Sequence, residues 1–281
     1  MHPDTADVLR DFSPDRFFSS YLARKPVVIP EKISHWPASR RWSPKYLMRQ
    51  YGDVSVVMAL YDPQSPSTFL HQTLDDTHRI MKLRDFLADI ESGDARYAVR
   101  EDTAFFERMP QLFDDLDNFL PFAGHAAVAD GRYKSLWVGP AQYVTGLHVD
   151  PGDTFLFQIY GRKHVVLFGP DEASFLYEED RELRRRKFKD SSLQSRLNPR
   201  DFAVLQDQVG WSCVQPFNPD LSRFPLFSRA HCIEAYIGPG DTLYIPDKWW
   251  HAVRALDVSI SVSMEPEFDG PLFTRDDRHG R

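Results

Sequence analysis

Cysteine is scarce in this chain: 281 residues contain two, Cys213 and Cys232. Because they are few and far apart, we expect neither a disulfide framework nor a cysteine-built zinc site. We interpret them as free or buried thiols in a reducing compartment. The first thirty residues mix acidic and basic side chains and are interrupted by proline, unlike a secretory signal. The sequence therefore predicts a cytoplasmic protein, or a nuclear one if the organism is eukaryotic.

Long apolar runs and an excess of positive charge are also missing. No run of about 18 apolar residues occurs, so we expect no membrane span. The net charge is −7 and the isoelectric point about 5.8, which disfavours a broad nucleic-acid surface. One basic run, residues 184–187, could form a nuclear signal or a phosphate-binding patch. The alternative is a solvated helix face balanced by acidic neighbours.

Apolar and aromatic residues are plentiful, at 42% and 14% of the chain. That is enough for one large packed domain, which we expect to span residues 1–281. Residues 1–132 should form helices and strands packed on a core at 133–268, with an insertion at 171–230. Few residues follow the last expected strand, too few for a helical dimerisation appendage, so we expect a monomer.

The N-terminal region predicts short capped elements. Helices are expected at 13–25, with Ser13 as N-cap and Pro14 at the first helical position, and at 43–52 and 81–93, each closed by glycine. Strands are expected at 26–30, 54–61 and 95–101.

From about residue 133 the pattern changes to apolar alternation with tight turns. We expect strands at 135–138, 145–150, 154–159, 164–168, 233–237, 242–245, 251–255 and 258–264. Many short strands joined by tight turns indicate a mainly β fold with flanking helices, built as a jelly roll of the cupin kind. We expect the insertion to be partly helical and to lie beside the barrel mouth.

His148 and Asp150 are separated by one residue on an expected strand, so both side chains should point into the barrel. Two histidines and one carboxylate form the facial triad of non-haem Fe(II) oxygenases. The spacing alone is weak, because the chain also contains a His2-Pro3-Asp4 decoy. His251, which opens a later strand after Trp249 and Trp250, supplies the second histidine. An ordinary core histidine is the alternative for that residue taken alone.

Lys163 begins the strand that returns beside His148. A buried ammonium needs an anion, and a dicarboxylic acid chelating the metal at its other end would suit it. Thr145 could add a hydroxyl to the same carboxylate. The alternative is a surface lysine in a Gly-Arg-Lys turn.

Three stretches together resemble a known family. They are "LWVGPAQYVTGLHVDPGDTFLFQIYGRKHVVLFGP", "NPDLSRFPLF" and "GPGDTLYIPDKWWHAVRALDVSISVSM". They are similar to the JmjC-domain Fe(II)/2-oxoglutarate oxygenases, in their cupin-like small hydroxylase branch, and most of all to its arginyl hydroxylases. The N-terminal "FFSSYLARKPVVI" extends the resemblance over nearly the whole chain.

The resemblance implies a double-stranded β-helix of the JmjC type and a defined set of site residues. His148, Asp150 and His251 would bind Fe(II), which reacts with O2. Lys163, Thr145 and Tyr97 would hold the distal carboxylate of 2-oxoglutarate, and Trp137 would line the substrate pocket.

Two positions depart from the family pattern. Thr154 stands where these hydroxylases commonly have an asparagine near the co-substrate, and Glu265 where the arginyl hydroxylases have a tryptophan of the substrate pocket. Residues 54–61 also show no clear counterpart of the acidic residue that recognises arginine. Arginine as the substrate therefore does not follow.

Four functions compete. The first is hydroxylation of an amino-acid side chain in a protein or peptide, and the second is hydroxylation of a free small molecule. Demethylation of an N-methyl group is disfavoured by the lack of reader modules. A non-catalytic cupin would predict loss of a triad residue or of Lys163, and neither is lost.

Overall fold

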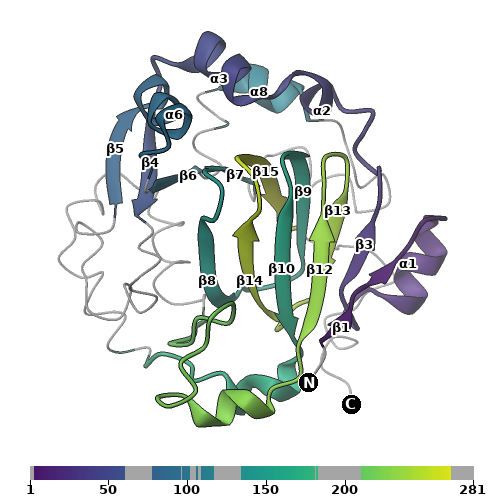
Figure 1. Cartoon of the computed structure of the whole chain (residues 1–281). Coiled ribbons are helices and arrows are strands. Elements are labelled where there is room, and N and C mark those ends of the chain that lie inside the picture. The colour runs from purple at the N-terminus through teal and green to yellow at the C-terminus, as the bar shows by residue number, and fades with distance from the viewer. Residues whose placement is uncertain are drawn as a thin grey trace.

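The computed structural model describes residues 3–60, 78–95, 97–101, 106, 109–116, 134–180, 182 and 210–266. In these residues two β-sheets face each other, and most of the α-helices lie along one end of the sandwich (Figure 1).

The smaller sheet provides most of the site. Its spatial order is β1 (Asp4–Thr5), β12 (Ile233–Ile237), β10 (Lys163–Phe168), β14 (Trp250–Ala255), β8 (Val144–Val149) and β11 (Gly210–Trp211). The larger sheet has the order β2 (Asp7–Val8), β3 (Val27–Ile29), β13 (Thr242–Ile245), β9 (Thr154–Tyr160), β15 (Ser259–Met264), β7 (Lys134–Gly139), β6 (Tyr97–Glu101), β4 (Ser55–Leu60) and β5 (His78–Lys82).

The chain moves repeatedly from one sheet to the other between residues 134 and 264. Strands β7, β9, β13 and β15 lie in the larger sheet, and β8, β10, β12 and β14 in the smaller one. This alternation is the arrangement of a jelly roll, and it confirms the mainly β, double-stranded β-helix fold predicted from the sequence. All eight core strands form where the period-two pattern indicates, with ends that differ by one residue at most.

The N-terminal elements follow their capping signals. Helix α1 (Pro14–Ser20) begins where the Ser13 side chain accepts a hydrogen bond from the Arg16 backbone, and α3 (Pro44–Tyr51) ends at Gly52. Two further short helices are α2 (Pro37–Arg41) and α8 (Pro110–Asp114). Two helix boundaries were wrong. Helix α1 ends at Ser20 and not near residue 25, and α6 (Leu83–Ser92) starts two residues late, because residues 81–82 complete β5, which pairs with β4.

Residues of the N-terminal region also extend the larger sheet at both edges. Strand β3 pairs with β13 at one edge, and β6 pairs with β7 toward the other. The edges of the core strands are thereby covered, and the sandwich presents fewer open backbone groups.

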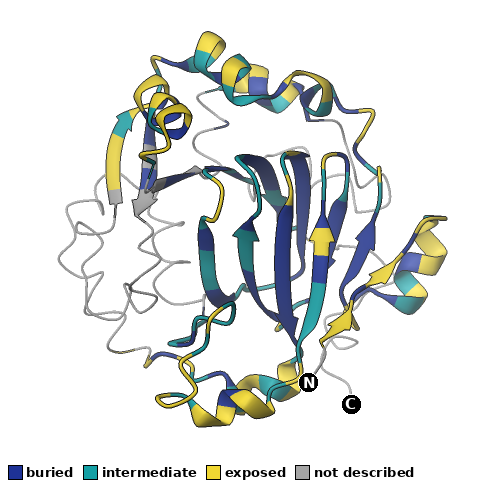
Figure 2. Cartoon of the chain, viewed as in Figure 1, coloured by how far each residue is buried: buried dark blue, intermediate teal, exposed yellow. Residues whose placement is uncertain are grey.

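The buried apolar residues form three clusters, and most of the core strands are dark blue in Figure 2, which marks them as buried. The largest cluster joins the helices to the outer face of the larger sheet and includes Phe17, Trp36 and Phe157. A second cluster, with Leu156 and Val165, fills part of the space between the sheets. The third covers the outer face of the smaller sheet. The polar side chains of the site lie in the remaining interior space.

The described part of the insertion contains two 3₁₀ helices, η1 (Pro170–Phe175) and η3 (Pro225–Arg229), and strand β11. Strand β11 joins the smaller sheet beside β8, which the sequence patterns did not indicate. The basic run at 184–187 lies outside the described residues.

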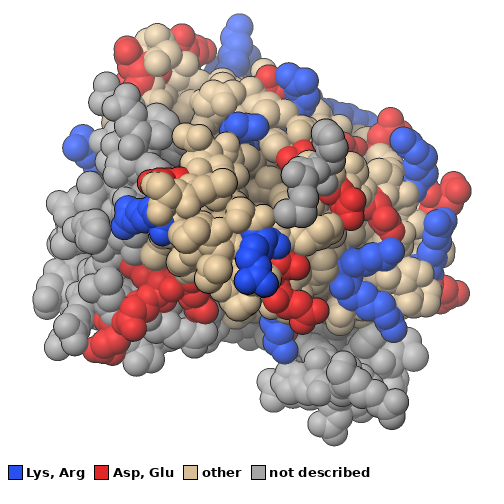
Figure 3. All heavy atoms as spheres, turned by 60° about the horizontal axis from the view of Figure 1, so that its bottom comes forward, with Lys and Arg blue, Asp and Glu red and all other residues tan. Residues whose placement is uncertain are grey.

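Charges of both signs are interspersed over much of the face shown in Figure 3, and acidic side chains gather at its lower left. The described residues on this face form no broad basic surface. Within the described residues, no helix combines the length and apolar character needed to cross a bilayer.

Candidate active site

Two histidines and an aspartate converge between the ends of β8 and β14. Potential ligand atoms of His148, Asp150 and His251 all lie within 4.8 Å of one another. The two Nε2 atoms lie 3.7 Å and 3.5 Å from oxygens of Asp150. Cis ligands about 2.1 Å from one ion lie roughly 3 Å apart, so these atoms are close to the spacing of an octahedral face. Strand β8 ends at Val149, so Asp150 is the first residue beyond the strand.

Each imidazole is oriented by a backbone carbonyl. His148 Nδ1 lies 2.7 Å from the Gly146 oxygen, and His251 Nδ1 lies 3.2 Å from the Trp249 oxygen. With the Nδ1 proton donated to the carbonyl, Nε2 carries the lone pair that a metal requires. The two histidines are cross-strand partners and are both buried. The arrangement is therefore ready to hold a cation away from bulk water.

A β-bulge brings Thr145 to the same side as His148. The two residues are three apart, so strict alternation would place their side chains on opposite faces. His148 pairs with His251 but Thr145 pairs with Val253, so three steps along β8 match two along β14. The extra residue of a bulge restores the inward direction.

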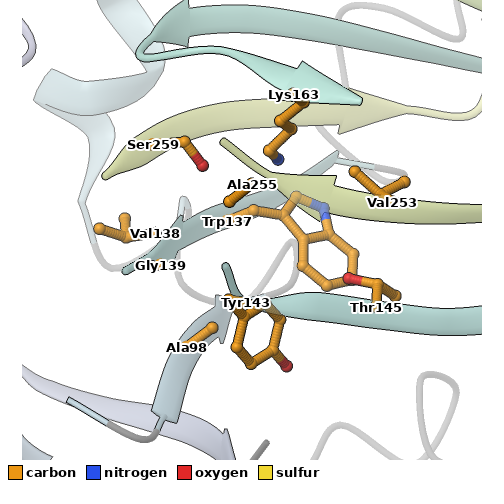
Figure 4. A pocket seen from close by; sticks show the side chains of 10 residues that line it. All are labelled: Ala98, Trp137, Val138, Gly139, Tyr143, Thr145, Lys163, Val253, Ala255 and Ser259. Atoms are coloured by element: carbon orange, nitrogen blue, oxygen red, sulfur yellow. The ribbon is translucent and has the colours of Figure 1, made fainter. Parts of the chain in front are cut away.

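A cavity lies further along the two strands that carry the histidines. Its walls include Thr145, three residues before His148 on β8, and Val253, two residues after His251 on β14. Its ten lining residues are Ala98, Trp137, Val138, Gly139, Tyr143, Thr145, Lys163, Val253, Ala255 and Ser259. Figure 4 shows the Lys163 side chain reaching into this space from β10, with Trp137 and Thr145 around it. Three residues predicted for the co-substrate or substrate thus meet in one cavity.

Lys163 is buried with 7% of its surface exposed, so it is not the surface lysine of the alternative interpretation. Its Nζ donates a hydrogen bond to Ser261 Oγ. Among the described residues no carboxylate pairs with it, and burial lowers the pKa of the Lys163 amine to about 7. A buried amine of this kind is suited to binding an anion that enters the cavity.

Comparison with known proteins shows to which family this chain belongs. The model of the cupin-like domain family matches residues 14–264. The chain belongs to the cupin-like domain family. Relatives whose names refer to the JmjC domain confirm the resemblance predicted from sequence.

Three relatives of this cupin-like chain show how far the similarity extends. "Lysine-specific demethylase 8" of Xenopus tropicalis is 32% identical over 89% of this chain and 50% of its own length. "Bifunctional peptidase and (3S)-lysyl hydroxylase JMJD7" of Homo sapiens is 25% identical over 92% of this chain and 83% of its own. "JmjC domain-containing protein D" of Dictyostelium discoideum is 28% identical over 91% and 54%. The chain thus spans about half the length of two of these three relatives.

The three other residues predicted for the site differ in where the structure places them. Thr154 is buried at the start of β9, and its hydroxyl has no hydrogen-bond partner in the described structure. Tyr97 begins β6, but its side chain lies outside the described part. Glu265 follows β15, half-buried, and is not among the residues that line the cavity.

Sequence reasoning missed Trp211, which stacks on the His148 ring with centroids 4.8 Å apart. It comes from β11 in the insertion, directly opposite His148. Of the two tryptophans before His251, Trp250 packs in the outer cluster, and Trp249 contributes its backbone carbonyl. Only the pairing of β11 with β8 reveals the role of Trp211, because its sequence context carries no motif.

Proposed function

We propose that this chain is an Fe(II)- and 2-oxoglutarate-dependent oxygenase that hydroxylates an amino-acid side chain of a protein or peptide. One observation carries the proposal. In the described residues, a buried amine with no carboxylate partner and a two-histidine, one-carboxylate cluster are carried by neighbouring strands of the same sheet, β10, β14 and β8. A metal-chelating dicarboxylic acid would satisfy both at once.

The donor set suits iron(II). Two imidazole nitrogens and one carboxylate leave three coordination positions open, as in the facial triad of Fe(II) oxygenases. His148, Asp150 and His251 would hold the ion, and the carbonyls of Gly146 and Trp249 would keep both rings in the ligating tautomer.

The interior polar groups suit 2-oxoglutarate. Lys163 and Thr145 would bind its distal carboxylate inside the cavity. The Thr154 hydroxyl, buried and without a partner in the described structure, is a further donor for the co-substrate. A hydroxyl can replace one hydrogen bond of the asparagine found in the family, but not both of its polar atoms.

When bound, iron with 2-oxoglutarate and O2 supplies the oxidising power that converts a C–H bond to C–OH, while 2-oxoglutarate becomes succinate and carbon dioxide. The protein's part is orientation and exclusion of water. His148 and His251 are 6% and 4% exposed, and the Trp211 ring covers one face of the first. A dry site limits oxidation that is not coupled to substrate.

A protein or peptide substrate is supported by the human relative, whose name includes lysyl hydroxylase and 83% of whose length is matched. Demethylation is a second candidate, because the Xenopus relative is named a lysine-specific demethylase. A free amino acid or biosynthetic intermediate is the alternative substrate class. The site geometry is compatible with all three, because they share the same attack on a C–H bond.

Turnover of 2-oxoglutarate to succinate tests the proposal. Iron-loaded protein is supplied with a peptide library in one arm and a metabolite pool in the other, and products are identified by mass. Gain of one oxygen supports hydroxylation, whereas loss of a methyl group supports demethylation. If succinate formed only with the metabolite pool, the substrate would be a free small molecule and not a protein or peptide.

His251→Ala should reduce turnover at least 100-fold, because it removes a metal ligand. His231→Ala is the matched control, since His231 is an exposed histidine that pairs with Asp4 and is not part of the triad. Undiminished turnover by His251→Ala would contradict the metal assignment.

A further inference from the structure

Strand β15 has its polar face turned inward. Serines alternate with apolar residues along it, and Ser259 and Ser261 are 2% and 0% exposed. The intervening Ile260 and Val262 pack in the large cluster beneath the helices. A strand in this position could bury apolar residues on both faces. Small hydroxyl side chains toward the sheet interface instead leave room and hydrogen-bonding capacity beside the cavity.

Two of these serines hold side chains that line the cavity. Ser261 Oγ accepts the hydrogen bond from Lys163 Nζ, and Ser263 Oγ accepts one from Trp137 Nε1 at 3.0 Å. Ser259 lines the cavity itself (Figure 4). Strand β15 therefore controls the position of both the amine and the aromatic wall of this space.

We propose that Ser261 is a positioning residue that holds the Lys163 amine in place for the distal carboxylate of the co-substrate. This inference rests on the proposed function. Lys163 comes from the smaller sheet and Ser261 from the larger one, so their hydrogen bond crosses the sandwich.

The physical reason lies in the flexibility of lysine. Its four-carbon stem has many rotamers, and binding a carboxylate requires that one of them be fixed. In the described structure the Ser261 hydroxyl is the hydrogen-bond partner of the buried Nζ atom. Without that hydroxyl the protonated amine would be buried with no acceptor and would deprotonate or turn away.

The test measures 2-oxoglutarate binding to the whole protein loaded with Co(II), by calorimetry between pH 6 and 9. Ser261→Ala should raise the Kd for 2-oxoglutarate about tenfold, the effect of losing one hydrogen bond to a charged group. The pH above which binding weakens should also move down, because the lost acceptor favoured the protonated amine. Tyr143 is the other titratable side chain among the residues that line the cavity.

Two controls separate positioning from general damage. Ser263→Ala deletes the same hydroxyl two residues along the same face, and should leave the pH dependence unchanged. Pyruvate, a 2-oxo acid without a distal carboxylate, should bind Ser261→Ala and wild type equally. If Ser261→Ala does not fold, Ser261→Cys keeps the shape with a weak acceptor and should show the same loss.

Wild-type affinity in Ser261→Ala, or equal weakening of pyruvate and 2-oxoglutarate, would overturn the inference alone. Failure of the wild-type protein to bind 2-oxoglutarate would instead overturn the proposed function, and the inference with it.

Discussion

At the scale of the single residue, burial determines the protonation state of the Lys163 amine. An exposed lysine stays charged at all physiological pH values, but burial lowers the pKa of this amine to about 7. Near neutral pH the group therefore changes between charged and neutral forms. In the charged form it pairs with a carboxylate, and in the neutral form it must first take up a proton.

The affinity for 2-oxoglutarate should consequently depend on pH. Binding should be strongest below about pH 7 and weaken above it, by up to about tenfold per pH unit, because the complex takes up one proton. Calorimetry on Co(II)-loaded protein in buffers of different ionisation enthalpy measures both the Kd and the proton uptake.

Lys163→Met is the matched control for this titration. It should bind 2-oxoglutarate weakly at every pH and without the lysine-linked proton uptake. A Kd for the wild type that stays constant between pH 7 and 9 would refute the assignment of Lys163.

At the scale of the element, two irregular features of the smaller sheet create the site. The bulge in β8 allows Thr145 and His148 to point inward although they are three residues apart. The two-residue strand β11 places Trp211 against the His148 ring. Its approach is close, because a Cβ at Gly210 would lie 2.7 Å from Val149 Cγ1 and 3.1 Å from Glu178 Oε1.

Gly210→Ala should therefore push β11 away from β8 and release Trp211 from His148. We expect the affinity for Co(II) to fall about tenfold, as when an outer partner of a ligand is lost. Metal titration followed by tryptophan fluorescence measures the change.

Gly146→Ala is the matched control in the neighbouring strand. A Cβ there would meet the Trp211 ring at 3.9 Å, an ordinary contact, and the carbonyl that orients His148 remains. Equal metal affinities in the two variants would show that the position of β11 is irrelevant to the metal site.

At the scale of the whole molecule, the site combines residues of both sheets. The triad comes from neighbouring strands of the smaller sheet, and the cavity is closed by Trp137 and Ser259 of the larger one. A ligand in this space would bind the folded protein and not the unfolded chain, so it should stabilise the fold.

Metal and 2-oxoglutarate together should raise the Tm. At a co-substrate concentration 100 times the Kd the stabilisation is about 2.7 kcal/mol, or roughly 5 °C for a domain of this size. Differential scanning fluorimetry checks this, with succinate and 2-oxoglutarate compared at equal concentration. If 2-oxoglutarate raised the Tm of Lys163→Met as much as that of the wild type, the shift would not arise in this cavity.

Much of this architecture could be predicted from residues that are neighbours in the sequence. Alternating apolar residues predicted all eight core strands, and Ser13 and Gly52 marked helix ends, because capping and strand periodicity depend on neighbours in the chain. His148 and Asp150 were found for the same reason, since one intervening residue suffices to place two side chains on one side. The sequence by itself thus determined the fold class and the residues of the triad.

Tertiary structure decided what depends on partners distant in sequence. The register of β8 against β14 creates the bulge, and the pairing of β11 with β8 brings Trp211 to the ring of His148. The direction of Ser261 could not be read from "SISVSM", because both faces of this strand are buried and the alternation does not say which of them meets the other sheet. That choice is set by the sheet and the helices that pack on the two faces, and no local pattern contains it.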